Sequence, residues 1–262
     1  MSSRASTVCR AVPAISEFQS GVRSQVVGRH FGATISTVFQ PWRTALGGHI
    51  VAVEAYARSR SKRGEDLSPW RLFSDVSVDH DLVSLDRLCR TVHALNHFAV
   101  AASEQALVLN VDARLLRAVP ERHGEFFGQV LALLGVSPAH IYIEIRTIHQ
   151  FDLTRLRQIM ASYRKQGFAV AVNAEGALHA RSLAQLLLPD LLMLDADVYT
   201  PEQLNRLVAA LAGSAVKIAI KRIESAAQAE AIKAAGANWV QGHYFDYPAA
   251  NMADAALAEV VQ

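Results

Sequence analysis

Polar side chains lie near the ends of the short apolar runs that recur along this chain. Three of them, Glu54, Asn110 and Glu144, belong to separate runs, and each offers an oxygen ligand. If the runs are neighbouring parallel strands, these oxygens converge at one edge, where they would suit a hard divalent cation such as Mg²⁺. The same groups could instead form a buried network of hydrogen bonds and salt bridges. Spacing alone leaves both interpretations open, and the network is the commoner arrangement.

Eight β-rich runs are predicted to be the strands that position these groups. They cover residues 37–42, 50–58, 106–112, 141–147, 169–175, 191–197, 216–222 and 237–245. Most are near-continuous apolar runs, which is typical of strands covered by helices. Helical patterns are found at about 82–98, 117–134, 150–166, 178–187, 201–212, 224–235 and 249–260. The alternation predicts an α/β fold, either a closed barrel or a doubly wound sheet.

The first two strands are predicted to pair differently from the rest. Only residues 43–49 connect them, including Gly47-Gly48, and this segment is too short for a crossover helix. We therefore expect an antiparallel hairpin at the start of the sheet. Two helix starts are also marked: Thr200, before Pro201, is an expected N-cap, and a second helix is expected to begin at Ser225 or Glu224.

The composition limits the class of protein. Of 262 residues, 51% are hydrophobic and 19% charged, which is enough for a buried core. The 26 basic and 24 acidic residues give no case for binding a nucleic-acid polymer. No apolar run approaches the roughly 20 residues of a membrane span, so no membrane association is expected. Two cysteines without a Cys-x-x-Cys pair suggest a reducing, cytoplasmic location.

The first 36 residues differ from the rest because they are poor in acidic residues. Their composition resembles that of a transit peptide, but a leader followed by a docking helix fits equally well. Ile15, Phe18, Val22 and Val26 fall at helical spacing and predict such a helix. We therefore expect a leader and docking helix over 1–36 and a single barrel domain over 37–262.

A set of motifs occurs in the same order as in the EAL-domain family and resembles the motifs of that family. Its members are cyclic di-GMP phosphodiesterases built on a TIM-like barrel. The family elements are Q-P-I, E-A-L-L-R, N-V-S, E-I-T-E, P-D-x-I-K-I-D, V-E-T and Q-G-Y-x-F-x-x-P. The segments that resemble them are, in order, Gln40-Pro41, Glu54–Arg58, Leu107–Val111, Ile141–Ile145, Pro189–Asp195, Ile223–Ser225 and Gln241–Pro248. The resemblance implies a TIM-like (β/α)8 barrel with an antiparallel first strand.

The resemblance also shows which catalytic groups this chain lacks. Asn173 stands where the family has the aspartate that bridges two metals, and Ala174 replaces the next aspartate. Met193 replaces the lysine that orders the attacking water, and Lys221 replaces a glutamate. Phosphodiester hydrolysis by this chemistry needs a metal-activated water. Two adjacent cations repel each other unless a carboxylate bridges them, so we expect no two-metal centre and no catalytic residues.

Other family residues remain. Gln40, Arg58, Asn110 and Gln241 match positions that hold the dinucleotide in the family, and the Arg58 guanidinium suits phosphate oxygens. The remnant of the metal site comprises Glu54, Asn110, Glu144 and Glu224. We expect no cofactor, although these oxygens leave room for a single, weakly held Mg²⁺. Lys221 is expected to stand in for the missing metal beside Glu54, Glu144 and Glu224.

The resemblance therefore implies a catalytically inactive, regulatory EAL-like protein of bacterial signal transduction. It would act through a protein partner, as a cyclic di-GMP receptor, or as both. The alternative is a weak phosphodiesterase with a rebuilt metal site. The sequence names no protein partner and leaves open whether the chain pairs with itself. His93 and His97, four residues apart on a predicted helix, are interpreted as ordinary surface or helix-packing residues rather than metal ligands.

Overall fold

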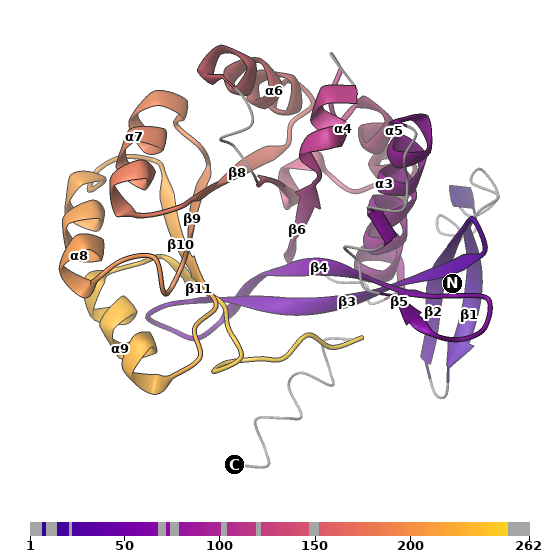
Figure 1. The fold of residues 1–262 in the computed structure, drawn as a ribbon, viewed down its shortest axis with the longest axis horizontal. Coiled ribbons are helices and arrows are strands. Elements are labelled where there is room, and N and C mark those ends of the chain that lie inside the picture. The colour runs from indigo at the N-terminus through magenta and orange to yellow at the C-terminus, as the bar shows by residue number, and fades with distance from the viewer. Residues whose placement is uncertain are drawn as a thin grey trace.

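A closed barrel of eight strands, with helices around its outside, forms the body of the computed structural model (Figure 1). The structure describes residues 7–8, 15–20, 23–67, 72–73, 79–100, 104–118, 122–146 and 152–250. The strands are β1 (Ile15–Ser20), β2 (Arg23–His30), β3 (Ala33–Thr44), β4 (Ile50–Arg60), β5 (Asp66–Leu67), β6 (Ala106–Val111), β7 (Ile141–Ile145), β8 (Ala169–Ala174), β9 (Leu191–Asp195), β10 (Lys217–Lys221) and β11 (Trp239–Val240). The helices are α3 (Asp79–Ala94), η1 (Leu95–Val100), α4 (Ala113–Ala118), α5 (Glu125–Leu134), η2 (Pro138–His140), α6 (Leu153–Lys165), α7 (Ala177–Leu187), α8 (Pro201–Ala210) and α9 (Ala226–Ala235).

The barrel closes through its one antiparallel member. Strands β4 and β6 to β11 pair in parallel, whereas β3 pairs antiparallel with both β4 and β11. The turn between β3 and β4 contains Gly48 at φ +67°, a conformation that favours glycine. The predicted hairpin and the TIM-like barrel with an antiparallel first strand are both confirmed.

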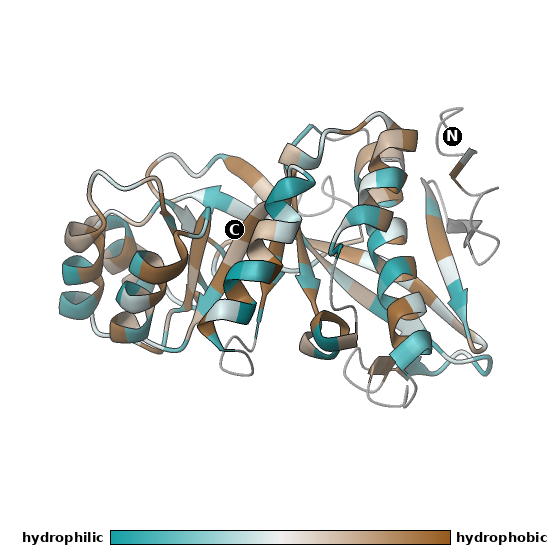
Figure 2. Ribbon diagram, turned by 90° about the horizontal axis from the view of Figure 1, so that it is seen from above, coloured by the Kyte–Doolittle hydropathy of each residue, from teal (hydrophilic) through white to brown (hydrophobic). Residues whose placement is uncertain are grey.

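Alternation along the strands separates two apolar layers. Outward-facing residues such as Val53, Leu109 and Ile143 pack against the helices in the large core. Inward-facing residues, including Val108 and Met193, fill the barrel interior. The helices carry both hydrophilic and hydrophobic bands, as expected when one face is buried (Figure 2). The next inward positions toward the strand ends are polar, and these positions form the site described below.

The predicted docking helix is wrong. Residues 15–20 and 23–30 form an antiparallel hairpin, β1 and β2, and β2 continues the sheet by pairing with β3. Val26 lies outside the part of β2 that pairs with β3. There the amide side chain of Asn96 bonds both the backbone N–H and the C=O of Val26, so these two groups of the extended strand are satisfied. Strand β3 also crosses the expected boundary at residue 36.

Smaller departures concern element ends. The helical pattern at 117–134 divides into α4 and α5 because Arg122 (φ 60°) and Gly124 (φ 83°) adopt left-handed conformations that end a helix. The last predicted strand is shorter, since the chain turns at 242–245. The expected N-cap Thr200 is confirmed, and of the two expected starts of the next helix, Ser225 is its N-cap. The helix expected at 249–260 lies outside the described residues, apart from its first two positions.

Among the described residues, no helix combines the length and apolarity needed to cross a membrane. His93 and His97 are buried on α3 and η1, which agrees with their interpretation as packing residues. His93 Nδ1 lies 2.7 Å from Thr37 Oγ1, and His97 Nε2 lies 2.8 Å from the carbonyl oxygen of Gln105.

These histidines should make the fold acid-sensitive. Burial lowers the pKa of His93 to about 3 and that of His97 to about 4, so the unfolded chain binds more protons below pH 6.5. The free energy of unfolding should therefore fall between pH 6.5 and 4.5, by up to about 1.4 kcal/mol per pH unit for each histidine. Urea unfolding of His93→Gln should show a smaller slope with pH than the parent. His80→Gln, at an exposed position, should keep the parent slope, and an unchanged slope in His93→Gln would contradict the prediction.

Candidate functional site

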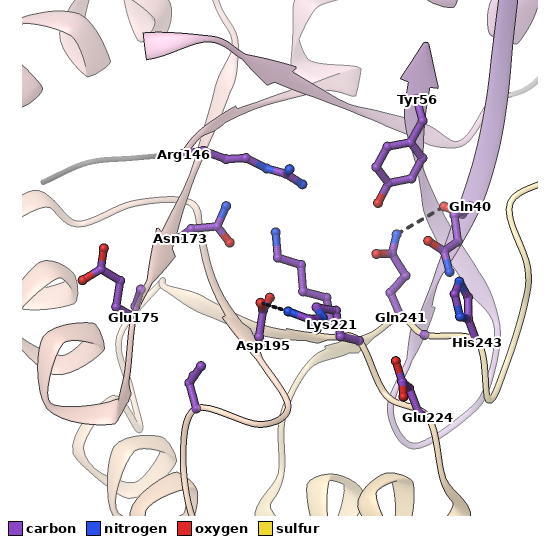
Figure 3. A pocket seen from close by; sticks show the side chains of 14 residues that line it. Gln40, Tyr56, Arg146, Asn173, Glu175, Asp195, Lys221, Glu224, Gln241 and His243 are labelled. Atoms are coloured by element: carbon purple, nitrogen blue, oxygen red, sulfur yellow. Dashed lines mark hydrogen bonds and ion pairs between the residues drawn. The ribbon is translucent and has the colours of Figure 1, made fainter. Parts of the chain in front are cut away.

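A cavity of about 710 Å³ opens at the carboxyl ends of the barrel strands, where barrel proteins place their working groups. Figure 3 shows its polar lining, with Lys221 reaching from β10 toward the middle of the cavity. The lining residues are Gln40, Tyr56, Arg146, Asn173, Ala174, Glu175, Asp195, Val198, Lys221, Arg222, Glu224, Gln241, Gly242 and His243.

Glu54 lies fully buried within β4 and is surrounded by donors. Its Oε1 accepts hydrogen bonds from Asn110 Nδ2 at 2.9 Å and from Arg146 Nη2 at 3.3 Å. Its Oε2 accepts from Gln241 Nε2 at 3.2 Å. Two of these donors, Asn110 and Gln241, were singled out by sequence, and the structure places them on the same carboxylate.

Glu144, on β7, is the second fully buried carboxylate, and two cations hold it. Lys221 Nζ lies 2.7 Å from Glu144 Oε1, and Arg146 Nε lies 2.9 Å from the same oxygen. Asn173 Nδ2 also donates to this oxygen. The expected contact between Lys221 and Glu144 is therefore present in the structure. Lys221 acts on Glu54 through charge, whereas Glu224 is exposed and influences Arg222 instead.

The two carboxylates differ in acidity. Burial raises the pKa of Glu54 above its ordinary value, and the neighbouring Glu144 raises it further. Burial also acts to raise the pKa of Glu144, but Lys221 and Arg146 outweigh it and hold that pKa well below its ordinary value. Glu144 is therefore ionised and paired, while Glu54 favours the proton more strongly. This split follows from placing both cations nearer to Glu144.

Arg146 is the residue that sequence reasoning missed. It bridges both buried carboxylates, while 46% of its side chain stays exposed to the cavity. A signal was present, because Arg146 directly follows Glu144-Ile145, at the place where the family's E-I-T-E has threonine. On an alternating strand, that position shares the inward face with Glu144.

The other predicted residues are placed as follows. Gln40 lines the cavity, and its Nε2 donates to the carbonyl oxygen of Asp246 at 3.0 Å. Arg58 is exposed on β4, donates to its neighbour's carbonyl oxygen, and does not line the cavity. Ala174 lines the cavity, whereas Met193 is fully buried in the barrel interior and offers nothing to a ligand.

The residues present do not fit a two-metal centre. Within the part of the chain that the structure describes, no group of three or more His, Cys, Asp or Glu side chains is arranged around a common point. Two buried acceptors, Asn110 Oδ1 and Glu144 Oε2, have no hydrogen-bond partner among the residues that the structure describes. These two oxygens fall short of the six or more ligands of a hard cation, and Lys221 and Arg146 would repel it.

Fold and site together define an α/β barrel with a polar cavity at the carboxyl ends of its strands. Its particular family is also clear, because the EAL domain model matches residues 32–248, and the chain belongs to the EAL-domain family. No functionally curated protein sequence matches the chain.

Solved structures with the same fold include three complexes with cyclic di-GMP. BlrP1 of Klebsiella pneumoniae, solved with manganese, is 17% identical with a TM-score of 0.70; the match covers 82% of this chain and 56% of that one. YkuI of Bacillus subtilis, with calcium, is 23% identical with a TM-score of 0.69, covering 83% and 56%. The FimX EAL domain of Xanthomonas citri is 18% identical with a TM-score of 0.66, covering 83% and 89%. The chain thus spans a little over half the length of BlrP1 and YkuI.

Proposed function

We propose that this EAL domain is catalytically inactive and acts as a cytoplasmic regulatory protein in bacterial signal transduction. The observation that carries the proposal is the ammonium group of Lys221, 2.7 Å from the Glu144 carboxylate. Together with Arg146, it neutralises the remaining carboxylates from within the chain. Hydrolysis by a metal-activated water needs those carboxylates for cations. The domain would therefore work by binding, without turnover.

The ligand we propose is cyclic di-GMP, bound without metal. The supporting features are a cavity of about 710 Å³ and the exposed part of the Arg146 guanidinium, which suits phosphate oxygens. Gln40 and Gln241 line the same cavity and offer amide groups. Three relatives of the same fold were solved with cyclic di-GMP. Binding of the nucleotide would alter the contacts of the domain with a protein partner. That partner could also be a second copy of this chain.

A weak phosphodiesterase with a single Mg²⁺ is the second candidate. The unpartnered acceptors Asn110 Oδ1 and Glu144 Oε2 favour it, since they could contribute two ligands to one ion. Both are oxygens, which Mg²⁺ prefers, and water would have to complete the shell.

One experiment separates the candidates. Cyclic di-GMP is titrated calorimetrically into the protein with EDTA or with Mg²⁺ or Mn²⁺, and the mixtures are analysed for linear product. We expect binding in EDTA and no product in any mixture. Product formed with metal at about 1 s⁻¹ would establish the phosphodiesterase instead. Absence of heat at high micromolar nucleotide in every condition would leave a protein-interaction module that binds no nucleotide.

Arg146 should determine the affinity for the nucleotide. In Arg146→Gln the guanidinium that faces the cavity is lost, and a charge-assisted hydrogen bond contributes roughly 1.5–3 kcal/mol. We expect the dissociation constant in EDTA to rise at least about tenfold. Arg60→Gln is the matched control, because Arg60 is exposed on β4 and pairs with Asp66 away from the cavity. Equal affinities for parent and Arg146→Gln would contradict the assignment.

A further inference from the structure

A second, smaller cavity lies among α3, α5 and α6, outside the barrel mouth. It has a volume of about 30 Å³ and is lined mainly by basic and aromatic side chains, among them Arg87, Arg90, Arg122, His123 and Tyr163. Helices α3 and α5 lie side by side in Figure 1, and their residues are in contact. We call this space the arginine cavity. The proposed nucleotide site uses none of its residues.

Arg90 is buried in the wall of the arginine cavity with donors to spare. Its side chain is 8% exposed, and its Nη2 pairs with Asp86 one helical turn earlier. Its Nε and Nη1 have no partner within hydrogen-bond distance among the described residues, although Tyr163 lies near enough to raise the pKa of Arg90 and the guanidinium lies 5.7 Å from the centre of the Phe127 ring. A buried unpaired donor is costly, so such groups usually mark an unseen water or ion.

His123 supplies a third buried nitrogen without a partner, which donates in one of the two tautomers of the neutral ring. Its Nε2 is buried without a partner in the described chain, and its ring stacks on Tyr163 with centroids 5.6 Å apart. Burial, together with the charges of Arg155 and Arg90, lowers the pKa of His123 to about 4, so the ring is neutral at pH 7. Because the two arginines lower the pKa of His123, the electrostatic potential at its ring is positive.

The surrounding charges favour an anion. Arg87 lies over the Phe126 ring at 4.8 Å, and Arg122 pairs with Glu125. Three guanidinium groups, those of Arg87, Arg90 and Arg122, line the cavity, and the carboxylates that pair with them, Asp86 and Glu125, are already engaged. The N-terminus of α5 also lies here, and its cap residue Gly124 supplies no side-chain acceptor, although the Glu125 N–H donates to the carbonyl oxygen of Arg122 at 3.3 Å. The positive end of the helix therefore adds to the field.

We propose that the arginine cavity is a binding site for a small inorganic anion of chloride size. A single water needs roughly 10–15 Å³, so the volume admits a water or a halide. A water accepts only two hydrogen bonds, whereas Arg90 Nε and Nη1 carry three N–H groups between them, and His123 Nε2 adds another in one of its two tautomers. A negatively charged acceptor in the cavity would take hydrogen bonds from Arg90 on α3 and from His123, which precedes α5.

Thermal unfolding in sodium chloride and in sodium gluconate at equal ionic strength tests the proposal. Chloride and bromide should raise the melting temperature saturably, gluconate should not, and phosphate should act more weakly because it is larger. His123→Phe keeps an aromatic ring to stack on Tyr163 but removes the ring nitrogen. The chloride concentration that gives half of the rise in melting temperature should therefore increase at least about tenfold. His80→Phe, at an exposed position, should behave as the parent.

A bromide-soaked crystal gives a second, independent measurement, which does not depend on the variant folding. An anomalous peak within hydrogen-bond distance of Arg90 Nε or Nη1 is expected at millimolar bromide. Identical melting in chloride and gluconate would overturn the proposal, as would a cavity that holds only water. A bromide peak seen only at molar concentration, without any effect in solution, would overturn it as well.

Discussion

Replacing Lys221 by methionine should lower the free energy of unfolding by about 3 kcal/mol at neutral pH. The change leaves Glu144, which is fully buried, without the ammonium at 2.7 Å. Arg146 and Asn173 still donate to the same carboxylate, which places the loss at the lower end of the range for a broken buried pair. Chemical denaturation of both proteins at pH 7 measures the difference directly.

The pH dependence identifies the cause of that loss. The pKa of Glu144 is depressed in the folded protein, so its stabilising contribution is present above its ordinary value of 4.5 and is lost as the pH falls through the folded pKa. The difference in free energy of unfolding between the parent and Lys221→Met should therefore be largest near pH 7 and should decrease below pH 4.5.

Two further variants complete the design for Lys221. Lys221→Met combined with Glu144→Gln removes both charges and should be more stable than Lys221→Met alone. Lys233→Met, at an exposed position on α9, should leave stability within about 0.5 kcal/mol of the parent. A Lys221→Met protein as stable as the parent would show that the ion pair does not hold the barrel mouth together.

The barrel was predictable because its signals are local and repeated. Near-continuous apolar strands alternated with helical patterns, and the short link containing Gly47-Gly48 required an antiparallel hairpin. The N-terminal hairpin was missed because apolar residues at positions 15, 18, 22 and 26 fit a helical period. The contact that fixes the strand, from Asn96 to Val26, spans 70 residues and leaves no local trace.

The site was predictable as a set of strand ends but not as a network. Asn110 and Glu144 are register partners on neighbouring parallel strands, and Glu54, whose register partner is Val108, lies near enough for the Asn110 amide to reach it. The contact of Lys221 with Glu144 follows from the same closure. Which donor reaches which oxygen depends on side-chain geometry, so Arg146 escaped notice and Arg58 was grouped with residues that it does not join.

Restoring two aspartates alone, by Asn173→Asp and Ala174→Asp, should not restore metal binding. Lys221 and Arg146 would remain within hydrogen-bond distance of Glu144 and would oppose any divalent cation placed there. We expect no change in melting temperature when Mn²⁺ is added to this double variant, and no hydrolysis of cyclic di-GMP.

Replacing the two basic side chains, Lys221 and Arg146, as well should allow metal to bind. A fourfold variant that adds Lys221→Glu and Arg146→Thr places several carboxylates close together and removes the two basic side chains that neutralised them. Because the carboxylates repel one another, this variant should be less stable than the parent in EDTA. Mn²⁺ at about one hundred times its dissociation constant should then stabilise it by about 2.7 kcal/mol. Turnover should still be absent, because Met193 stays buried in the barrel interior and cannot order a water. If Mn²⁺ stabilised the double variant as much as the fourfold one, Lys221 and Arg146 would not be the barrier to metal.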